Sequence, residues 1–305
     1  MFRHQRSLLV SQAVLLLASA AGAQEVALTF DDLPRTGELP PNTTRVEIVR
    51  TIARILQEAH APPVYGFVNA GKLTSAPGEI EALKAWTAAG FPLANHGYSH
   101  FNLAKTSVRR YTRDITADEP VLRSLKNDGG DWHWFRYPYL EEGETLRKKH
   151  AVSAFLRKHD YRVAEVTLDF EDFLWNAPYA RCLEQDDKPG IDWLKSNYLI
   201  AAEEYIDLGQ EMSQRLYGRD IKHVMLLHVG GFEAVMLPEL LELLKRKDFK
   251  LIPLEDAGSD PAYRSSPEWP TRRGGDFLSL TMHKRGLEIP PHRKLPIRQL
   301  NSICR

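Results

Sequence analysis

The sequence predicts an α/β protein in which parallel strands are covered by helices, arranged either as a barrel or as a doubly wound sheet. Short apolar runs alternate with longer amphipathic runs through about seven units, and this alternation is typical of parallel sheets. No internal repeat at a fixed period is visible. The 305 residues, 43% of them hydrophobic, suffice for one large domain with a short appendage.

In the first half of the chain, the expected elements are bounded by residues that start or stop them. A strand is expected over 25–30 and a helix over about 46–59. Residues 42–44 supply capping side chains for this helix, and its apolar residues recur every three to four positions. Pro62 and Pro63 end this helix, and Gly90 ends the helix that follows the second strand. The other elements expected here are strands over 64–68, 91–95 and 132–135, and helices over 79–89 and 107–125, the latter interrupted near Pro120.

The second half continues the same alternation up to residue 255. From Asp256 onward, Pro, Gly, Arg and Ser dominate, which predicts an extended tail with at most local structure. The sequence therefore divides into a leader (1–23), a main α/β domain (24–255) and a C-terminal tail (256–305). The elements expected in the second half are helices over 145–158, 192–217 and 237–246, and strands over 161–168, 222–227 and 249–254.

The first 23 residues have the features of a secretory signal peptide. Arg3 and Arg6 form a positive start, residues 8–20 are mostly apolar, and 21–23 form a small-residue cleavage site. The apolar stretch is shorter than the ~20 residues of a membrane span. We therefore expect cleavage, no transmembrane segment afterwards, and a secreted or periplasmic protein.

The balance of 40 basic and 40 acidic residues gives no reason to expect nucleic acid as a partner, because phosphate binding needs a concentrated basic surface. Removing the leader leaves 38 basic residues, a net charge of −2. The segment 264–305 carries a local charge of +6, so 24–263 carries −8. We expect the tail to contact either the acidic surface of its own domain or an anionic envelope polymer.

The two cysteines, Cys182 and Cys304, allow one disulfide in an oxidising compartment. Their spacing resembles no zinc or redox motif. Their distance in sequence, and the position of Cys304 near the end of a polar tail, weigh slightly against pairing.

Polar residues follow five of the expected strands, at the edge where functional side chains of parallel α/β proteins gather. A single histidine or aspartate at such a place is commonly structural, but five such sites at one edge predict a shared active site. These residues are Asp31 and Asp32, His96 and His100, Arg136, Asp169 and Asp172, and His228.

His96 and His100 have a spacing that lets two imidazoles meet at one ion if the intervening turn is helical. Asp31 or Asp32 would add a carboxylate oxygen, leaving positions open for water and substrate, as in catalytic rather than structural zinc sites. The second aspartate would be free to take a proton from the attacking water.

Amide hydrolysis also requires a proton for the leaving nitrogen. His228 is the natural donor, because its charge changes near neutral pH. Arg136 keeps its proton and would orient a nearby carboxylate. Asp172 would hold His228 in the protonated state.

These residues resemble the polysaccharide deacetylases of carbohydrate esterase family 4, which share the NodB homology domain. The similarity runs from about Glu25 to Leu254. All five family motifs occur in order, as Thr29-Phe30-Asp31-Asp32-Leu33-Pro34, His96-Gly97-Tyr98-Ser99-His100, Arg136-Tyr137-Pro138-Tyr139, Asp169-Phe170-Glu171-Asp172-Phe173 and Leu226-Leu227-His228.

The resemblance implies a distorted (β/α) barrel of about seven parallel strands and metal-dependent removal of an acetyl group from an N-acetylated sugar. It further implies a general base, Asp31; a general acid, His228; metal ligands Asp32, His96 and His100; and supporting residues Arg136 and Asp172. The residues it implies near the substrate or the oxyanion are Tyr137, Pro138, Tyr139, Phe173 and Trp175, with Tyr179 a further candidate for sugar stacking.

Three residues depart from the usual family pattern: Leu33 replaces Gly, Gly97 replaces Ser or Thr, and Phe173 replaces Trp. None of them is a ligand or catalytic group, so they bear on polymer specificity. The segment 178–190 and the helix after it also bear on the shape of the substrate groove.

Several alternatives stay open at this stage. The substrate class includes peptidoglycan, chitin oligomers, exopolysaccharide and acetylated xylan, and Zn²⁺, Co²⁺, Ni²⁺ and Fe²⁺ all accept this ligand set. A small-molecule amidohydrolase or a non-catalytic carbohydrate-binding protein on the same fold are rival functions. Non-haem iron oxygenases use similar ligands but sit on a jelly roll, which the alternation disfavours, and motifs of serine hydrolases and HExxH proteases are absent from the sequence.

Overall fold

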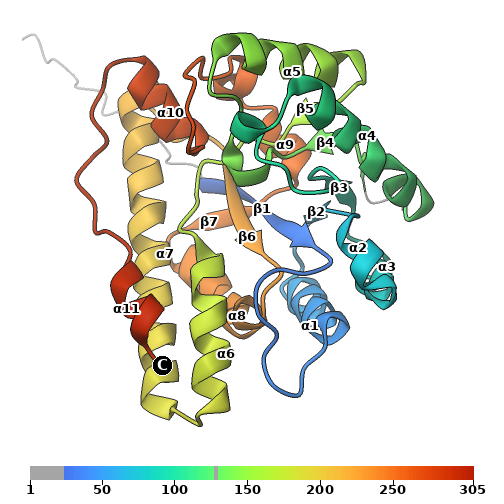
Figure 1. Cartoon of the computed structure of the whole chain (residues 1–305). Helices are drawn as coiled ribbons and strands as arrows, with labels where there is room; N and C mark the ends of the chain where they lie inside the picture. Colours follow the sequence, from blue (N-terminus) through green and yellow to red (C-terminus); the bar gives the residue numbers. More distant parts are fainter. Residues whose placement is uncertain (1–23, 127–129) are drawn as a thin grey trace, which may run out of the picture.

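The computed structural model, which describes residues 24–126 and 130–305, contains a curled, seven-stranded, all-parallel sheet (Figure 1). The strand order is β5-β4-β3-β2-β1-β6, with β7 also paired to β1. This half barrel confirms the predicted fold class. The leader lies outside the described residues. The strands are β1 (Gln24–Leu33), β2 (Tyr65–Val68), β3 (Leu93–Asn95), β4 (Trp134–Phe135), β5 (Arg162–Val163), β6 (His223–His228) and β7 (Phe249–Leu251).

Strand β1 is the centre of the sheet because it pairs with three neighbours, β2, β6 and β7. Its residues from Val26 to Phe30 are buried, as expected for a parallel strand covered on both faces. The register places Asp31 beside His228 at the carboxyl ends of β1 and β6. The sheet thereby brings two of the predicted functional residues together.

The predicted strand over 161–168 is only two residues long in the structure. After Val163 the chain leaves the edge of β4 and runs to β6, where Leu168 forms an isolated parallel bridge with Met225. The prediction was wrong for this segment because residues 164–168 span the opening between the two edges of the curled sheet. Their burial, which gave the strand-like pattern, comes from closing the barrel.

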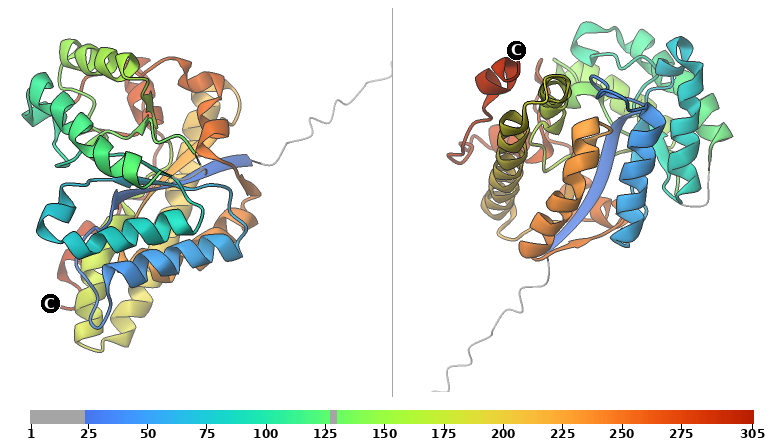
Figure 2. Two further views of the ribbon diagram at one scale, coloured as in Figure 1. Left: turned by 90° about the vertical axis from the view of Figure 1, so that its right-hand side faces the viewer. Right: turned by 90° about the horizontal axis from the view of Figure 1, so that it is seen from below.

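Helices cover the sheet, and Figure 2 shows α1 and α3 lying side by side. Thr44 begins α1 and forms a reciprocal capping box with Glu47, which confirms the predicted cap. No helix among the described residues is long and apolar enough to cross a membrane. The longer helices are α1 (Arg45–Glu58), α3 (Ile80–Ala88), α4 (Val108–Ser124), α5 (Leu146–Lys158), α6 (Asn176–Glu184), α7 (Lys188–Tyr217) and α8 (Gly231–Arg246), and α2 (Lys72–Ser75) is a single turn.

Helix α4 continues through Pro120, where the sequence predicted an interruption. Tyr111 and Ile115 before the proline, and Leu122 after it, are buried on one face of the helix. A proline removes one backbone hydrogen bond from a helix. The burial of apolar residues on both sides of Pro120 offsets that loss.

The C-terminal segment also differs from its prediction, because it packs against the domain. It contains α9 (Leu254–Gly258), α10 (Phe277–Lys284) and α11 (Ile297–Ser302). Phe277 and Met282 of α10 are buried in a hydrophobic cluster with Met212 of α7, and Leu300 of α11 is buried in the main core. Several of its apolar residues lie in these short helices, and the overall polar composition of the segment did not reveal them.

A disulfide joins Cys182 of α6 to Cys304, with 5.0 Å between the Cα atoms. The slight expectation against pairing was wrong, because the tail is docked rather than free and brings Cys304 beside α6 (Figure 1). Arg181 supports this docking by donating hydrogen bonds to the carbonyl oxygens of Leu300 and Ile303.

We expect removal of this disulfide to lower the free energy of unfolding by about 2–4 kcal/mol, since it closes a long loop in the unfolded chain. The measurement is denaturant unfolding of a variant carrying both Cys182→Ser and Cys304→Ser, compared with oxidised wild-type protein; reduced wild-type protein serves as a second disulfide-free sample. An unchanged midpoint in the double variant would contradict this expectation.

Candidate active site

A cavity of about 360 Å³ lies at the carboxyl ends of the strands and contains most of the predicted site residues. We call it the strand-end cavity. Arg136 and Asp172 lie behind its lining and contact residues that face it. All five polar strand ends therefore come together, as the sequence predicted. The strand-end cavity is lined by Asp31, Asp32, Thr36, His96, His100, Tyr139, Leu140, Asp169, Glu171, Phe173, Leu226, His228, Arg273 and Gly275.

Three of these residues form a candidate metal site. Ligand atoms of Asp32, His96 and His100 all lie within 4.8 Å of one another, and His100 Nε2 is 3.6 Å from Asp32 Oδ1. The two histidines meet through an irregular turn rather than the helical turn assumed from their spacing, with φ of 73° at Gly97 and 53° at His100. Glycine adopts this left-handed conformation without a steric penalty.

The protonation of the two histidines suits a metal. His96 Nδ1 lies 2.8 Å from the carbonyl oxygen of Arg136. Because a carbonyl only accepts, Nδ1 carries the hydrogen and Nε2 keeps its lone pair, as in metal-binding histidines. Burial lowers the pKa of both His96 and His100 to about 3. Two neutral imidazoles and one carboxylate thus form a donor set that fits a catalytic divalent cation.

Asp32 is held in its ionised form. Burial alone would raise the pKa of this carboxyl, but the positive charge of Lys72 and further charges of the site outweigh it and hold the pKa low. Lys72 Nζ lies 2.8 Å from Asp32 Oδ1 and also donates to the carbonyl oxygens of Asp32 and Arg35. Thr36 Oγ1 donates to the other carboxylate oxygen at 3.1 Å. Lys72 therefore fixes both the orientation and the charge of the candidate ligand.

Asp31 is paired with Arg136, as predicted. Arg136 Nη1 lies 3.2 Å from Asp31 Oδ1, and both side chains are almost fully buried. The guanidinium is itself fixed by hydrogen bonds to Ala164 O and Thr29 Oγ1. Burial raises the pKa of Asp31 and outweighs the opposing charge of Arg136. This carboxyl combines a fixed orientation with an increased tendency to accept a proton.

His228 is paired with Asp172, again as predicted. The distance between His228 Nδ1 and Asp172 Oδ1 is 2.7 Å, and the backbone N–H of His228 donates to the other oxygen at 2.8 Å. Burial alone would lower the pKa of His228, but the charge of Asp172 and its hydrogen bond raise it to about 9. The imidazole is therefore protonated at neutral pH and can supply a proton.

Of the residues predicted near the substrate, Tyr139 and Phe173 line the strand-end cavity. Tyr139 packs beside His100 and Phe173 beside His228, with ring centroids 4.5 and 5.1 Å apart. Both are exposed aromatic side chains. This placement fits contact with a sugar ring.

Trp175, Tyr179, Pro138 and Tyr137 do not line that cavity with their side chains. Trp175 is completely buried and contacts Phe170, so it cannot stack on a sugar. Tyr179, half-buried, packs against the core instead. Their aromatic character, which suggested sugar stacking, serves the packing of α6 and α7.

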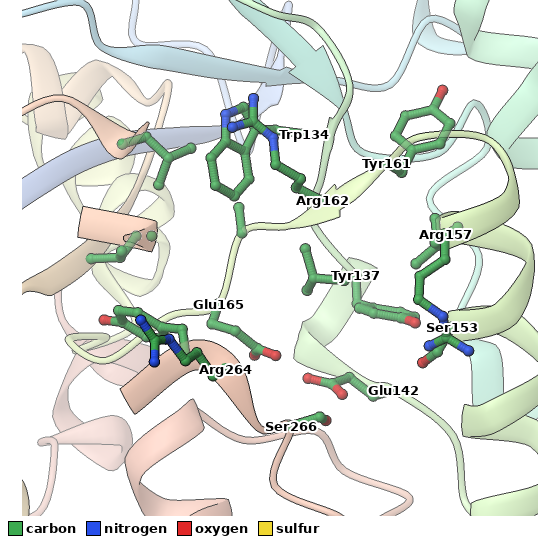
Figure 3. Close-up of a pocket in the computed structure, with 17 residues that line it drawn as sticks. Trp134, Tyr137, Glu142, Ser153, Arg157, Tyr161, Arg162, Glu165, Arg264 and Ser266 are labelled. Atoms are coloured by element: carbon green, nitrogen blue, oxygen red, sulfur yellow. The ribbon is translucent and has the colours of Figure 1, made fainter. Parts of the chain in front are cut away.

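Tyr137 points to the opposite side of β4, into a second cavity of about 380 Å³. Figure 3 shows its hydroxyl directed toward Ser153, with the carboxyl groups of Glu142 and Glu165 facing one another nearby. Alternation of side chains along an extended segment explains this: Arg136 points toward Asp31, so its neighbour points away. Only the backbone of Tyr137 is left for the predicted oxyanion role.

The sequence analysis missed several residues of the site. Lys72 and Thr36 follow β2 and β1 outside any motif, and Glu171 was noted only as part of a motif. Arg273 and Gly275 belong to the segment predicted as an extended tail. No local pattern marks them, because their position depends on the docking of residues 256–305.

A comparison with protein families matches residues 18–162 to the polysaccharide deacetylase family. This similarity covers just under half of the chain and agrees with the resemblance that the motifs indicate. The matched region contains the first three motifs and ends before Asp169 and His228, which the structure places in the same cavity. The comparison with curated proteins found no match to this chain.

Solved structures with the same fold include enzymes and a pseudoenzyme of carbohydrate esterase family 4. The chitin deacetylase of Colletotrichum lindemuthianum has a TM-score of 0.53 at 19% identity, over 78% of this chain and 88% of that one. A family 4 carbohydrate esterase of Streptomyces lividans has a TM-score of 0.50 at 17% identity, over 78% and 97%. A family 4 pseudoenzyme of Bacillus anthracis has a TM-score of 0.52 at 14% identity, over 77% of this chain and 65% of that one. At these identities the similarity shows the fold alone.

Proposed function

We propose that this protein is a secreted, metal-dependent deacetylase that hydrolyses the N-acetyl group of an N-acetylated sugar polymer or oligomer. The observation that carries the proposal is the meeting of three groups in one cavity. These are the donor set of Asp32, His96 and His100, the Arg136-oriented carboxylate of Asp31, and the protonated His228. Peptidoglycan, chitin oligomers and exopolysaccharides are the substrates to test.

Each of these residues has a distinct task in the proposed mechanism. A divalent cation held by Asp32, His96 and His100, with Zn²⁺ the first choice, would supply an activated water and polarise the acetyl carbonyl. Asp31, oriented by Arg136, takes a proton from the attacking water. His228, kept protonated by Asp172, gives its proton to the departing nitrogen, and the products are acetate and the free amine. The backbone N–H of Tyr137 is proposed to help hold the developing charge on the acetyl oxygen.

The same residues also bear on the rival functions, which are a non-catalytic binding protein, an acetylxylan esterase and a small-molecule amidohydrolase. A non-catalytic carbohydrate-binding protein on this fold needs neither a base nor an acid, whereas Asp31 and His228 are both present and both held by partners. An acetylxylan esterase or a small-molecule amidohydrolase would use the same groups. These two are separated from the proposal by the substrate that is hydrolysed.

We also propose that the protein works outside the cytoplasm. Support comes from the leader-like sequence of residues 1–23 and from the Cys182–Cys304 disulfide, because disulfides persist mainly in oxidising compartments.

The proposed function is tested by acetate release from N-acetylglucosamine oligomers, peptidoglycan and acetylxylan, with and without a chelator. We expect release from at least one N-acetylated substrate, its loss after metal removal, and its recovery on adding Zn²⁺. Release that persists after complete metal removal would refute the mechanism, and release from acetylxylan alone would favour the esterase.

A further inference from the structure

The C-terminal segment supplies part of the strand-end cavity. Arg273 and Gly275 line it together with Asp31, Asp32 and His228, although they lie more than a hundred residues beyond the end of the family match at residue 162. The segment 271–277 therefore lies outside the matched family region.

The segment 271–277 is held firmly at both ends. The backbone N–H of Thr271 donates to Gly143 O at 3.3 Å, and that of Phe277 donates to Val166 O at 2.7 Å. Between them, Gly274 has a φ of 73°, and a Cβ added there would lie 2.0 Å from the carbonyl oxygen of Tyr139. The segment thus packs directly against the exposed aromatic residue of the third motif, at a distance that only glycine permits.

Arg273 lies in the cavity lining. Among the described residues that line this cavity, no other is a lysine or an arginine. Its side chain is exposed. Within residues 24–126 and 130–305, its guanidinium has neither an acidic partner nor a hydrogen-bond acceptor, and only its backbone N–H is bonded, to Thr271 Oγ1. Lys72 and Arg136, by contrast, are both bonded to aspartates.

The charge around Arg273 restricts what it would bind. The cavity lining carries the carboxyl groups of Asp31, Asp32, Asp169 and Glu171 together with the protonated His228. An anion is disfavoured close to the four carboxyl groups. A guanidinium presents several N–H donors in a planar arrangement that matches the two oxygens of a carboxylate. An anionic substituent of the substrate would therefore be favoured beside Arg273, and this contact would orient the sugar.

We propose that Arg273 is a specificity residue that binds a carboxylate carried by the substrate, so that the enzyme prefers N-acetylated sugars with an anionic substituent over neutral chitin-type oligomers. This inference rests on the proposed function, because it concerns the substrate of the same cavity. Two sources share the required chemistry: the lactyl ether of muramic acid in peptidoglycan, and the uronate of an alternating uronate and N-acetylhexosamine polymer.

The test compares wild type, Arg273→Gln and Arg273→Lys, with Arg272→Gln as the matched control. Arg272 is the exposed neighbour in the same segment and does not line the cavity. The probes are a peptide-free peptidoglycan glycan, the same glycan after reduction of its carboxyl groups, a uronate and N-acetylhexosamine oligosaccharide, and a chitin tetramer. For each probe, acetate release gives kcat and KM, and calorimetry gives the dissociation constant.

We expect wild type to favour one carboxylate probe over its neutral counterpart by about tenfold or more, as for a hydrogen bond to a charged group. Arg273→Gln should remove this preference through KM and the dissociation constant for the carboxylate probe. Arg273→Lys should restore it in part, and Arg272→Gln should keep it. The favoured carboxylate probe identifies the source.

Equal use of carboxylate and neutral probes by wild type would overturn the role of Arg273, as would an equal loss on both kinds of probe in Arg273→Gln. If no probe releases acetate, the proposed function fails. The calorimetric comparison of wild type with Arg273→Gln still decides the binding role in that case, so the two failures are distinguishable. Thermal unfolding of each variant confirms that the exposed substitution leaves the fold intact.

Discussion

Asp31→Asn is expected to lower kcat for deacetylation by about 10²–10⁴-fold, the usual contribution of a general base, while the protein still binds its metal. The asparagine keeps the shape of the side chain and its position beside Arg136, but it cannot accept the proton from water. Acetate release and metal content, measured on the same sample, separate these two effects. Metal binding should persist because Asp32, His96 and His100 are unchanged.

The control for this variant is Asp207→Asn, which removes an exposed carboxylate of α7 that pairs with Lys247 on the surface. It should have wild-type activity. Because Asp31→Asn leaves the buried guanidinium of Arg136 without its counter-charge, unfolding midpoints must accompany the kinetics. Unchanged turnover in folded, metal-loaded Asp31→Asn would show that another group is the base.

The second large effect concerns pH. His228 has a pKa of about 9, so its protonated form is present below that pH and is lost as the pH rises through it. If His228 is the general acid, activity should fall along an alkaline limb near pH 9. Removing it by His228→Gln should cost about 10²–10⁴-fold in kcat at neutral pH.

Asp172→Asn tests the origin of this pKa. The charge of Asp172 is the main factor that opposes burial, and other groups that interact with His228 include Asp31, Asp32, Asp169 and Glu233. Without Asp172, the pKa of His228 should fall, and the alkaline limb should move to lower pH by about 1–3 units. The measurement is kcat against pH for both proteins; superimposable profiles would exclude this pairing as the source of the alkaline limb.

The fold class and most of the site could be predicted from the sequence because both follow from short-range patterns. Apolar runs such as 25–30 and 64–68 mark buried strands, and polar residues directly after such runs lie at one edge of a parallel sheet. Asp31, His96 and His228 were therefore placed near one another before any long-range contact was known. Adjacent motif residues also identified the pairs that Arg136 and Asp172 form.

The direction of side chains could be predicted less well. Tyr137 and Trp175 are aromatic, as sugar-binding residues often are. Tyr137, however, points into the second cavity, and Trp175 is completely buried. The alternation of side chains along the extended segment decides the direction of Tyr137, and the packing of neighbouring helices decides the burial of Trp175. Such packing involves residues outside the motif, for example Tyr198 of α7 against Trp175.

The sequence by itself determined the alternating α/β architecture, the candidate donor set for a metal and the acid and base candidates, because each depends on residue types at short spacing. The tertiary structure alone decided that the polar C-terminal segment is docked, that Cys182 pairs with Cys304, and that Arg273 and Lys72 enter the site. These features depend on contacts between segments far apart in the chain, 122 residues apart for the two cysteines. The packing of the whole domain, rather than any local pattern, governs the formation of these contacts.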